Sequence, residues 1–361
     1  MRDFSEIVDA CVEWTATVLF RPFKPKKWLI LASIALLAGS LNLGNLNLQL
    51  PSSDTSQQKT EKLASKESAL NQKQPPKALK EIGQDFLRKF KNPKFFTLFV
   101  TLFAVALALF LFSVWLSCRF KFIFLENVSR NSASIKIPFK QNKKIGDSYF
   151  LFSLALFALF LILSGGIIFC SLFTLAKAGV LRNPAALGFL KVFLVCLPFA
   201  FALLLLMLVF VFLSWFTYDF VLPVMFKDKI KILQAWKKVM VIFHFRKPAL
   251  FKYILLRIVL SFCCALTSGV ISLISLISFV PLGILAWGVY LVFLILPGWL
   301  KIVYLAVIAI IGMPVLLCLL CCLLCVNLPF AVFLRALSLK FIARIEPGYN
   351  LFRYVPTAEV A

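Results

Sequence analysis

One acid and one base in otherwise apolar sequence are the residues most able to do chemistry. Asp219 lies in "TYDFVLPVMF", after a run without charge since Lys191, and Arg257 lies in "YILLRIVLSF". Either charge alone is costly in lipid, so we expect the two to pair. Arg119, in "SCRFKF", occupies the position equivalent to Asp219 in a similar stretch and could compete for it. The three form a candidate membrane-embedded ion-pair cluster.

This cluster has two interpretations. It could act as a proton or ion relay or as a headgroup-binding site. Alternatively, Asp219 and Arg257 form an interfacial ion pair that fixes helix packing. The packing role is favoured because neither residue is expected at the bilayer midplane, where transport sites usually lie.

The motif "CLLCCLLC" places four thiols at i, i+3, i+4 and i+7, on one face of a helix. Soft thiolates suit monovalent copper or zinc. However, one straight helix cannot arrange four ligands tetrahedrally, and no histidine or carboxylate stands nearby in the sequence. Cysteine also packs well as a small apolar side chain, which is the favoured role. The weak metal candidates are Cys318, Cys321, Cys322 and Cys325.

The sequence contains no recognisable catalytic constellation. His244 is the only histidine, and it stands in the basic stretch "FHFRKP". No nucleophile elbow or glycine-rich phosphate loop is present. We therefore expect a protein that is not an enzyme and that has no cofactor.

The elements that carry these residues are membrane spans. The chain has 361 residues, is 61% hydrophobic and contains 40 phenylalanines. A helix crosses the hydrocarbon core with about 20 apolar residues, and the uncharged runs lack the alternation of barrel strands. The runs cover residues 95–117, 149–176, 192–215, 258–300 and 302–334, with a shorter sixth run at 28–43. The sequence predicts an all-α polytopic transmembrane protein with about six spans; residues 281–299 could add a seventh or re-enter the membrane.

The basic residues indicate the orientation and the partners. The formal net charge is +24, and the Lys and Arg residues are scattered over the segments between spans. This distribution favours topology and anionic headgroups, and disfavours nucleic-acid binding. With both termini cytoplasmic, 24 Lys and Arg lie inside and 14 outside. The expected anionic-lipid contacts are Lys227, Lys229, Lys231, Lys237 and Lys238.

The chain divides into five predicted parts. Interfacial amphipathic helices are expected between the spans, and a polar, partly disordered loop is expected outside. The parts are a cytoplasmic segment (1–27), the first span (28–48), an extracytoplasmic loop with an amphipathic helix (49–94), a membrane domain with basic loops 119–148 and 217–252 (95–328), and a cytoplasmic tail (329–361).

Two similar stretches suggest an internal repeat. "FSVWLSCRF" (112–120) and "FLSWFTYDF" (212–220) share Phe, Trp and Phe at the same offsets, where a span leaves the membrane. The pattern predicts three units, each an interfacial helix followed by two spans. Chance similarity among phenylalanine-rich segments is the alternative.

Three stretches resemble an uncharacterised family of bacterial multi-pass inner-membrane proteins that carry a domain of unknown function. They are "CRFKFIFLENVSRNSASIKIPFKQNKKIGDSYF" (118–150), "YDFVLPVMFKDKIKILQAW" (218–236) and "LPFAVFLRALSLKFIARIEPGYNLF" (328–352). The resemblance implies the bacterial inner membrane as location and implies no activity.

These observations favour a non-enzymatic membrane component that organises lipids or partner proteins. A membrane-protein partner or a second copy of the chain is the expected protein partner. The alternative is a transporter or channel for a small solute or lipid that uses the Asp219–Arg257 pair.

Overall fold

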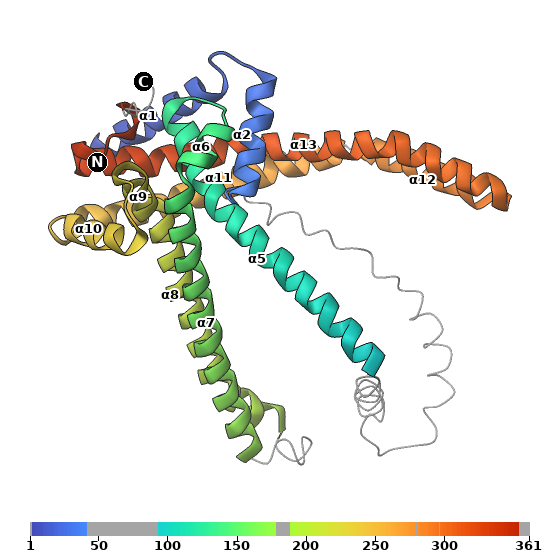
Figure 1. The fold of residues 1–361 in the computed structure, drawn as a ribbon, viewed down its shortest axis with the longest axis horizontal. Helices are drawn as coiled ribbons and strands as arrows, with labels where there is room; N and C mark the ends of the chain where they lie inside the picture. Colours follow the sequence, from blue (N-terminus) through green and yellow to red (C-terminus); the bar gives the residue numbers. More distant parts are fainter. Residues whose placement is uncertain (1, 42–92, 178–187, 279, 296, 354–361) are drawn as a thin grey trace. The chain divides into compact units, whose positions relative to one another are not determined.

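The computed structural model describes residues 2–41, 93–177, 188–278, 280–295 and 297–353 (Figure 1). Within these ranges the regular structure is helical, without strands. The predicted extracytoplasmic loop (49–94), with its disordered part and its amphipathic helix, lies outside the described residues except for residues 93 and 94. The helices are α1 (Arg2–Leu19), α2 (Pro25–Leu37), α5 (Pro93–Arg130), α6 (Lys136–Gln141), α7 (Lys143–Lys177), α8 (Gly188–Phe216), η3 (Thr217–Val221), α9 (Leu222–Asp228), α10 (Ile232–His244), α11 (Lys247–Ser278), α12 (Val280–Ile295), α13 (Gly298–Ile345), η4 (Pro347–Tyr349) and η5 (Leu351–Arg353).

The chain forms two compact units. The smaller covers Leu43–Val114, and the larger covers Met1–Asn42 and Trp115–Ala361. Helix α5 begins in the smaller unit and ends in the larger one. In the described part of the smaller unit, α5 exposes hydrophobic side chains such as Leu102, at 67%.

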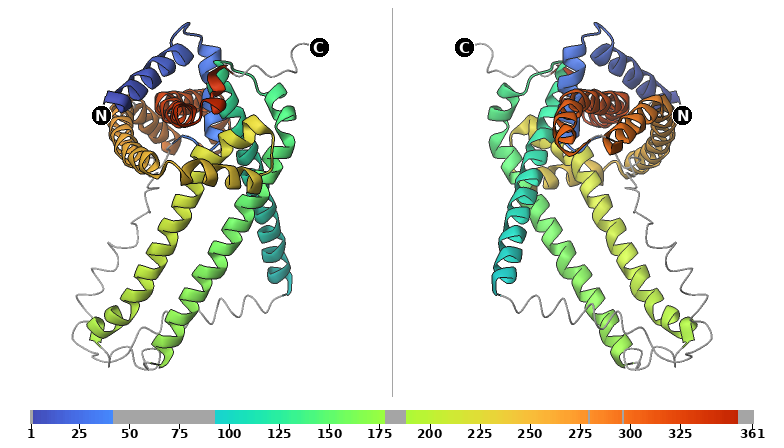
Figure 2. Two further views of the ribbon diagram at one scale, coloured as in Figure 1. Left: turned by 90° about the vertical axis from the view of Figure 1, so that its left-hand side faces the viewer. Right: turned by 90° about the vertical axis from the view of Figure 1, so that its right-hand side faces the viewer.

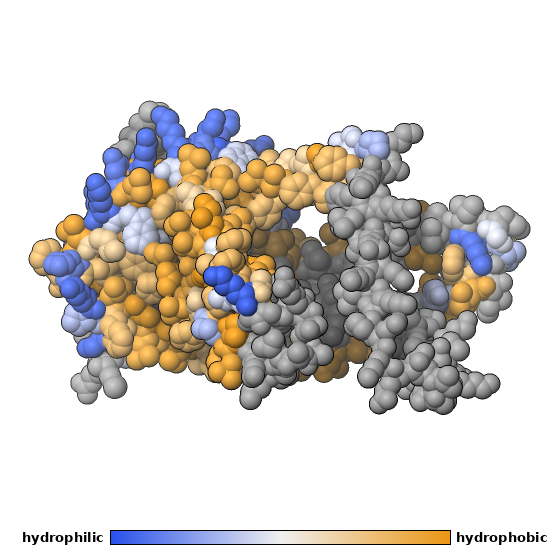
Figure 3. All heavy atoms as spheres, turned by 90° about the horizontal axis from the view of Figure 1, so that it is seen from below, coloured by the Kyte–Doolittle hydropathy of each residue, from blue (hydrophilic) through white to orange (hydrophobic). Residues whose placement is uncertain are grey.

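Five helical segments of the described residues are long and apolar enough to cross a membrane. They are Phe96–Arg130, Lys143–Lys177, Phe193–Asp228, Lys247–Ser275 and Leu324–Ile345. The prediction of an all-α transmembrane protein is thereby confirmed. Helix α12 has 16 residues and is not one of these segments. It contacts α13, where the Tyr304 hydroxyl donates a hydrogen bond to the carbonyl of Val289 in α12 at 2.9 Å. Hydrophobic residues cover much of the surface seen in Figure 3.

The first three candidate spans are longer than a bilayer requires. They contain 35, 35 and 36 residues. At about 1.5 Å per residue each exceeds the hydrocarbon core, which is about 30 Å thick. In α8, hydrophobic residues are exposed as far as Phe212, whereas Phe216 is buried. The lipid-facing helices therefore continue into a protein core, and α7 and α8 run side by side toward it (Figure 2).

Helix α2 belongs to this core. Its 13 residues bury Leu31, Ala32, Ile34 and Ala35, and it packs against α13, as does α1. At about 20 Å, α2 is shorter than the hydrocarbon core. The predicted first span (28–48) continues from α2 into residues that the structure does not describe.

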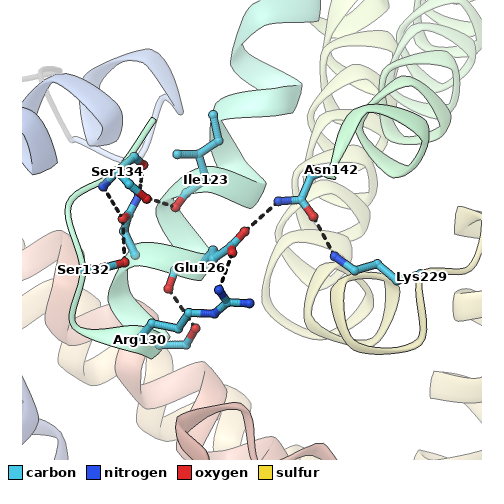
Figure 4. Close-up of polar contacts among 9 residues, drawn as sticks. Ile123, Glu126, Arg130, Ser132, Ser134, Asn142 and Lys229 are labelled. Carbon is cyan, nitrogen blue, oxygen red and sulfur yellow. Dashed lines mark hydrogen bonds and ion pairs between the residues drawn. The ribbon is translucent and has the colours of Figure 1, made fainter. Parts of the chain in front are cut away.

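A buried polar network holds the end of α5 (Figure 4). Glu126, 2% exposed, pairs with Arg130 at 2.9 Å and accepts a hydrogen bond from Asn142 Nδ2 at 2.8 Å. Lys229 donates to Asn142 Oδ1 at 2.8 Å. Asn127 Oδ1 accepts from the Ser132 hydroxyl and the Ser134 amide, both at 2.9 Å. The network joins α5, the loop after it, and the turn between α9 and α10.

The predicted three-unit repeat stays a prediction, and the helix lengths agree with it in two places only. A shorter helix precedes a longer one twice, α6 before α7 and α10 before α11, whereas α1 has 18 residues and α2 has 13. The predicted boundary between membrane domain and tail, at residues 328 and 329, falls inside α13, which runs unbroken to Ile345.

Candidate functional site

Asp219 is buried in the π-helical turn η3, with 0% of the residue exposed. The Tyr253 hydroxyl donates a hydrogen bond to its Oδ2 at 2.9 Å. Arg257 forms an ion pair with the same oxygen, at 3.3 Å from Nε. Tyr253 and Arg257 are four residues apart on α11 and thus share a helix face. The predicted Asp219–Arg257 contact is present, with Tyr253 as a third member.

Pro223 accounts for the unusual backbone at this site. Proline has no N–H, so it cannot donate to the carbonyl four or five residues earlier, here Asp219 or Tyr218. The Ser338 hydroxyl donates to the Asp219 carbonyl instead, at 2.6 Å, and Arg335 Nη1 donates to the Tyr218 carbonyl at 2.8 Å. Helix α13 thus satisfies both carbonyls, and single π turns of this kind often mark functional sites.

Arg335 lies beside η3 and is more deeply buried than Arg257, at 1% against 7% exposure. Its Cζ lies 4.5 Å from the centroid of the Tyr218 ring, a cation–π distance. Among the described residues, its Nε and Nη2 have no hydrogen-bond partner. A buried guanidinium with two unused donors is costly unless something else accepts those bonds.

Lys121 reaches the same region from α5. Its Nζ lies 5.1 Å from the Tyr149 ring centroid and 5.9 Å from that of Tyr218. Within the described ranges, neither Lys121 nor Arg335 forms an ion pair with a carboxylate. The two cations therefore share Tyr218 as a neutral partner.

A cleft of about 250 Å³ opens beside these residues. Three cations contribute to its wall, together with the hydroxyl-bearing residues Ser40 and Tyr218, whose oxygens are 2.9 Å apart. The lining residues include no carboxylate, so Asp219 lies outside the wall of the cleft. The lining is Ala38, Gly39, Ser40, Lys121, Trp215, Tyr218, Arg257, Ala331, Leu334 and Arg335.

Arg119 lies in a separate charge pair. It binds Asp147 at the start of α7, with Nη2 2.8 Å from Oδ1 and 3.1 Å from Oδ2. Its Cζ also lies 4.1 Å from the Trp115 ring centroid and 5.0 Å from that of Phe139. The structure therefore brings Arg257, and not Arg119, to Asp219. In both stretches of the predicted repeat, the charged residue four positions after the tryptophan pairs with a charge on a later long helix. Arg119 pairs with Asp147 on α7, and Asp219 pairs with Arg257 on α11.

The cysteine motif lies on α13. Cys321 and Cys325 are partly exposed, Cys322 is exposed, and the Cys318 side chain is outside the described ones. In the described part of the chain, no group of three or more His, Cys, Asp or Glu residues is placed to hold a metal.

Helix α10 carries the basic surface. Four side chains that face the core are buried: Ile232, Ala235, Val239 and Phe243. Lys231, Lys237 and Lys238 are exposed around the helix. Exposed hydrophobic residues accompany them: Leu233 (66%), Met240 (57%), Val241 (60%) and Phe245 (80%). Exposed lysines beside exposed hydrophobic residues are typical of a helix at a membrane interface.

The five predicted lipid-contacting lysines differ in their contacts. Lys238 pairs with Asp228 at 2.7 Å, and Lys229 is held by Asn142. The Nζ of Lys227 lies 4.8 Å from the centroid of the Tyr349 ring. The side chains of Lys231 and Lys237 form no hydrogen bond or ion pair with the described residues. These two are the most available for lipid.

Sequence reasoning missed Lys121, Arg335 and Tyr253. Arg335 lies in the predicted cytoplasmic tail (329–361), but it follows an uncharged run and stands in "FLRALSL", much as Arg257 stands in "LLRIVLS". The spacing of Tyr253 four residues before Arg257 was a second available signal. No feature of the sequence distinguishes Lys121, because it lies among several basic residues between predicted spans.

Comparison with known proteins places the chain in a family. No curated protein and no solved structure matches it. One family model, described as a family of unknown function (DUF7544), matches residues 3–352, nearly the whole chain. The protein therefore belongs to the DUF7544 family of unknown function.

Proposed function

We propose that this protein is a non-enzymatic, multi-pass component of the bacterial inner membrane that gathers anionic phospholipids, and through them organises the lipid or protein partners around it. Both chain ends are cytoplasmic in this proposal. The distribution of Lys and Arg and the resemblance to a bacterial inner-membrane family support it.

One observation carries the proposal: α10 and the residues that cap it expose both lysines, Lys231 and Lys237, and hydrophobic side chains, Met240 and Phe245. The hydrophobic side chains favour the boundary between headgroups and acyl chains, and the lysines favour anionic headgroups. Each basic residue near an anionic surface contributes about 1 kcal/mol. Since the opposite face of α10 packs on the core, the helix is held in place before lipid binds.

The test is the lipid retained during purification. Wild type and Lys231→Gln/Lys237→Gln are extracted in mild detergent from one membrane preparation, and the retained lipids are quantified by mass spectrometry. The matched control is Lys136→Gln/Lys140→Gln, which removes two exposed charges from α6.

We expect the α10 variant to lose most of its excess of anionic over zwitterionic lipid, while the α6 variant keeps more of it. Equal retention by the α10 variant and wild type would overturn the proposal. Equal losses in both variants would assign the effect to total charge and remove α10 from it.

A second candidate is a transporter for a small solute or lipid that uses Asp219 and Arg257. The cleft that reaches Arg257 favours it. The Asp219→Asn protein that remains folded after reconstitution should then be unable to support flux, and exchange of the two charges should restore part of it. Unchanged flux in Asp219→Asn excludes the pair as a transport element.

A further inference from the structure

We propose that the cleft beside η3 is a phosphate-binding site. Its cationic donors are Lys121, Arg257 and Arg335, and its ligand is the phosphate group of a phospholipid or of a small soluble phosphate. The site is independent of the α10 surface, because none of the residues that line it belongs to α10.

The first support is a charge imbalance. Three cations line the cleft, whereas the nearby carboxylate of Asp219 is bound by Tyr253 and Arg257. Buried cations cost several kcal/mol each unless a counter-charge accompanies them. No such counter-charge lies among the described residues for the buried Arg335, or for Lys121, which is partly exposed. An anion in the cleft supplies it.

The second support is unused hydrogen-bonding capacity. Arg335 is 1% exposed, and its Nε and Nη2 have no partner among the described residues. The bond from its Nη1 to the Tyr218 carbonyl and the stacking on the Tyr218 ring fix the orientation of the guanidinium. The forked donors of arginine match the oxygens of a phosphate, which makes phosphate a better fit than a halide.

The wall also offers neutral donors. The hydroxyls of Ser40 and Tyr218 are 2.9 Å apart, so one of them can turn its proton toward a ligand oxygen while it accepts from the other. Gly39, at φ 65°, ends α2 beside them in a left-handed conformation that suits glycine. Hydroxyl donors and cations together can surround the several oxygens of one phosphate.

The size and position of the cleft fit a headgroup-sized ligand. At about 250 Å³ it is slightly below the usual range for drug-sized ligands, about 300–1,000 Å³. Trp215 forms part of the wall, and three residues before it the exposed hydrophobic surface of α8 ends at Phe212. Tryptophan is enriched at the level of lipid headgroups. The cleft therefore lies where lipid-facing helix becomes protein core.

The experiment measures ligand protection of Lys121 in the wild-type protein. Delipidated protein in neutral detergent is acetylated briefly, and the modification of each lysine is quantified by mass spectrometry. One arm adds inorganic phosphate, a second adds phosphatidylglycerol in micelles, and a third adds the neutral lipid diacylglycerol. Lys136, exposed on α6, is the internal control.

We expect acetylation of Lys121 to fall at least about fivefold with phosphate or with phosphatidylglycerol, and to be unchanged by diacylglycerol, while Lys136 does not change. Protection by phosphate identifies a soluble ligand, and protection by the lipid alone identifies a headgroup. If neither arm protects Lys121, or if Lys136 is protected equally, the proposal is wrong.

A variant provides the second measurement. Arg335→Lys keeps the positive charge but loses the planar guanidinium with its several N–H donors. The ligand concentration needed for half-protection of Lys121 should therefore rise about tenfold. The Lys231→Gln/Lys237→Gln variant should leave that concentration unchanged, which separates this site from the proposed α10 surface. An unchanged value in Arg335→Lys, with the fold intact, would show that Arg335 does not hold the ligand.

Discussion

The Tyr253 hydroxyl donates to Oδ2 of Asp219 at 2.9 Å, so the carboxylate of η3 has a neutral donor as well as the Arg257 cation. Both donors project from one face of α11, and the carboxylate comes from the π turn that precedes Pro223. This arrangement joins η3, which directly follows α8, to α11. It also orients Arg257, which lines the neighbouring cleft.

Removal of the Asp219 charge should destabilise the protein strongly. Asp219→Asn leaves Arg257 buried without its counter-charge, and breaking a buried pair in this way costs about 3–5 kcal/mol. Thermal unfolding in detergent should show a Tm lower by several degrees. Asp228→Asn, which breaks the more exposed pair with Lys238, is the control and should cost about 1 kcal/mol or less. Equal stability of the two variants would contradict a structural role for the Asp219 pair.

Gly146 should not tolerate a methyl group. A Cβ at this position would lie 3.0 Å from Cγ of Arg119 and 3.6 Å from its Cα. Gly146→Ala should therefore cost about 1–3 kcal/mol, because Arg119 must move away from Asp147. Gly165→Ala, also on α7, meets nothing within 4 Å and should be neutral or stabilising by up to about 1 kcal/mol. A comparison of Tm values tests this, and equal losses in both variants would refute the close packing at Arg119.

Asn142 should behave as a structural bridge. Its side chain joins Glu126 to Lys229, so Asn142→Leu leaves a buried carboxylate oxygen and an ammonium group without that partner (Figure 4). The expected loss is about 2–3 kcal/mol. Gln141→Leu, at the exposed neighbouring position, is the control. Limited proteolysis in the turn between α9 and α10 should be faster only in the Asn142 variant.

Cys11 should resist alkylation until the protein unfolds. The thiol is 0% exposed, and its burial raises the pKa from 9.0 to about 12. At pH 8.5 this shift alone lowers the thiolate fraction by nearly three orders of magnitude. Reaction with iodoacetamide, followed by mass spectrometry, should therefore be at least about a hundredfold slower in folded protein than in denatured protein. Similar rates in both states would contradict the burial of α1 against the core.

The same shift has a consequence for stability. The folded state keeps the Cys11 thiol protonated, whereas the unfolded thiol ionises near pH 9. The stability that this group contributes is therefore complete below about pH 9 and is lost as the pH rises toward 12. The Cys11→Ala variant should show a weaker loss of stability over that interval than wild type.

Hydrophobicity made the membrane helices and the Asp219–Arg257 pair predictable. Uncharged runs mark spans, and two isolated opposite charges near span ends have few other partners. The same reasoning could not place Arg335 beside Tyr218, because that contact joins residues 117 positions apart through the backbone carbonyl freed near Pro223. Nor could it separate Arg119 from Asp219, since the choice of Asp147 depends on how α5 packs against α7.

The depth of α10 in a bilayer tests the proposed lipid-gathering role most directly. A genetically encoded spin-labelled amino acid is placed at Phe245 or at Lys237, and its collisions with oxygen, which enters lipid, and with a water-soluble nickel complex are compared by electron paramagnetic resonance. If α10 lies at the membrane surface, a label at position 245 meets oxygen preferentially and a label at position 237 meets nickel preferentially. Equal preference for nickel at both positions would place α10 in water, away from the membrane surface, and would contradict its proposed role in gathering anionic lipid.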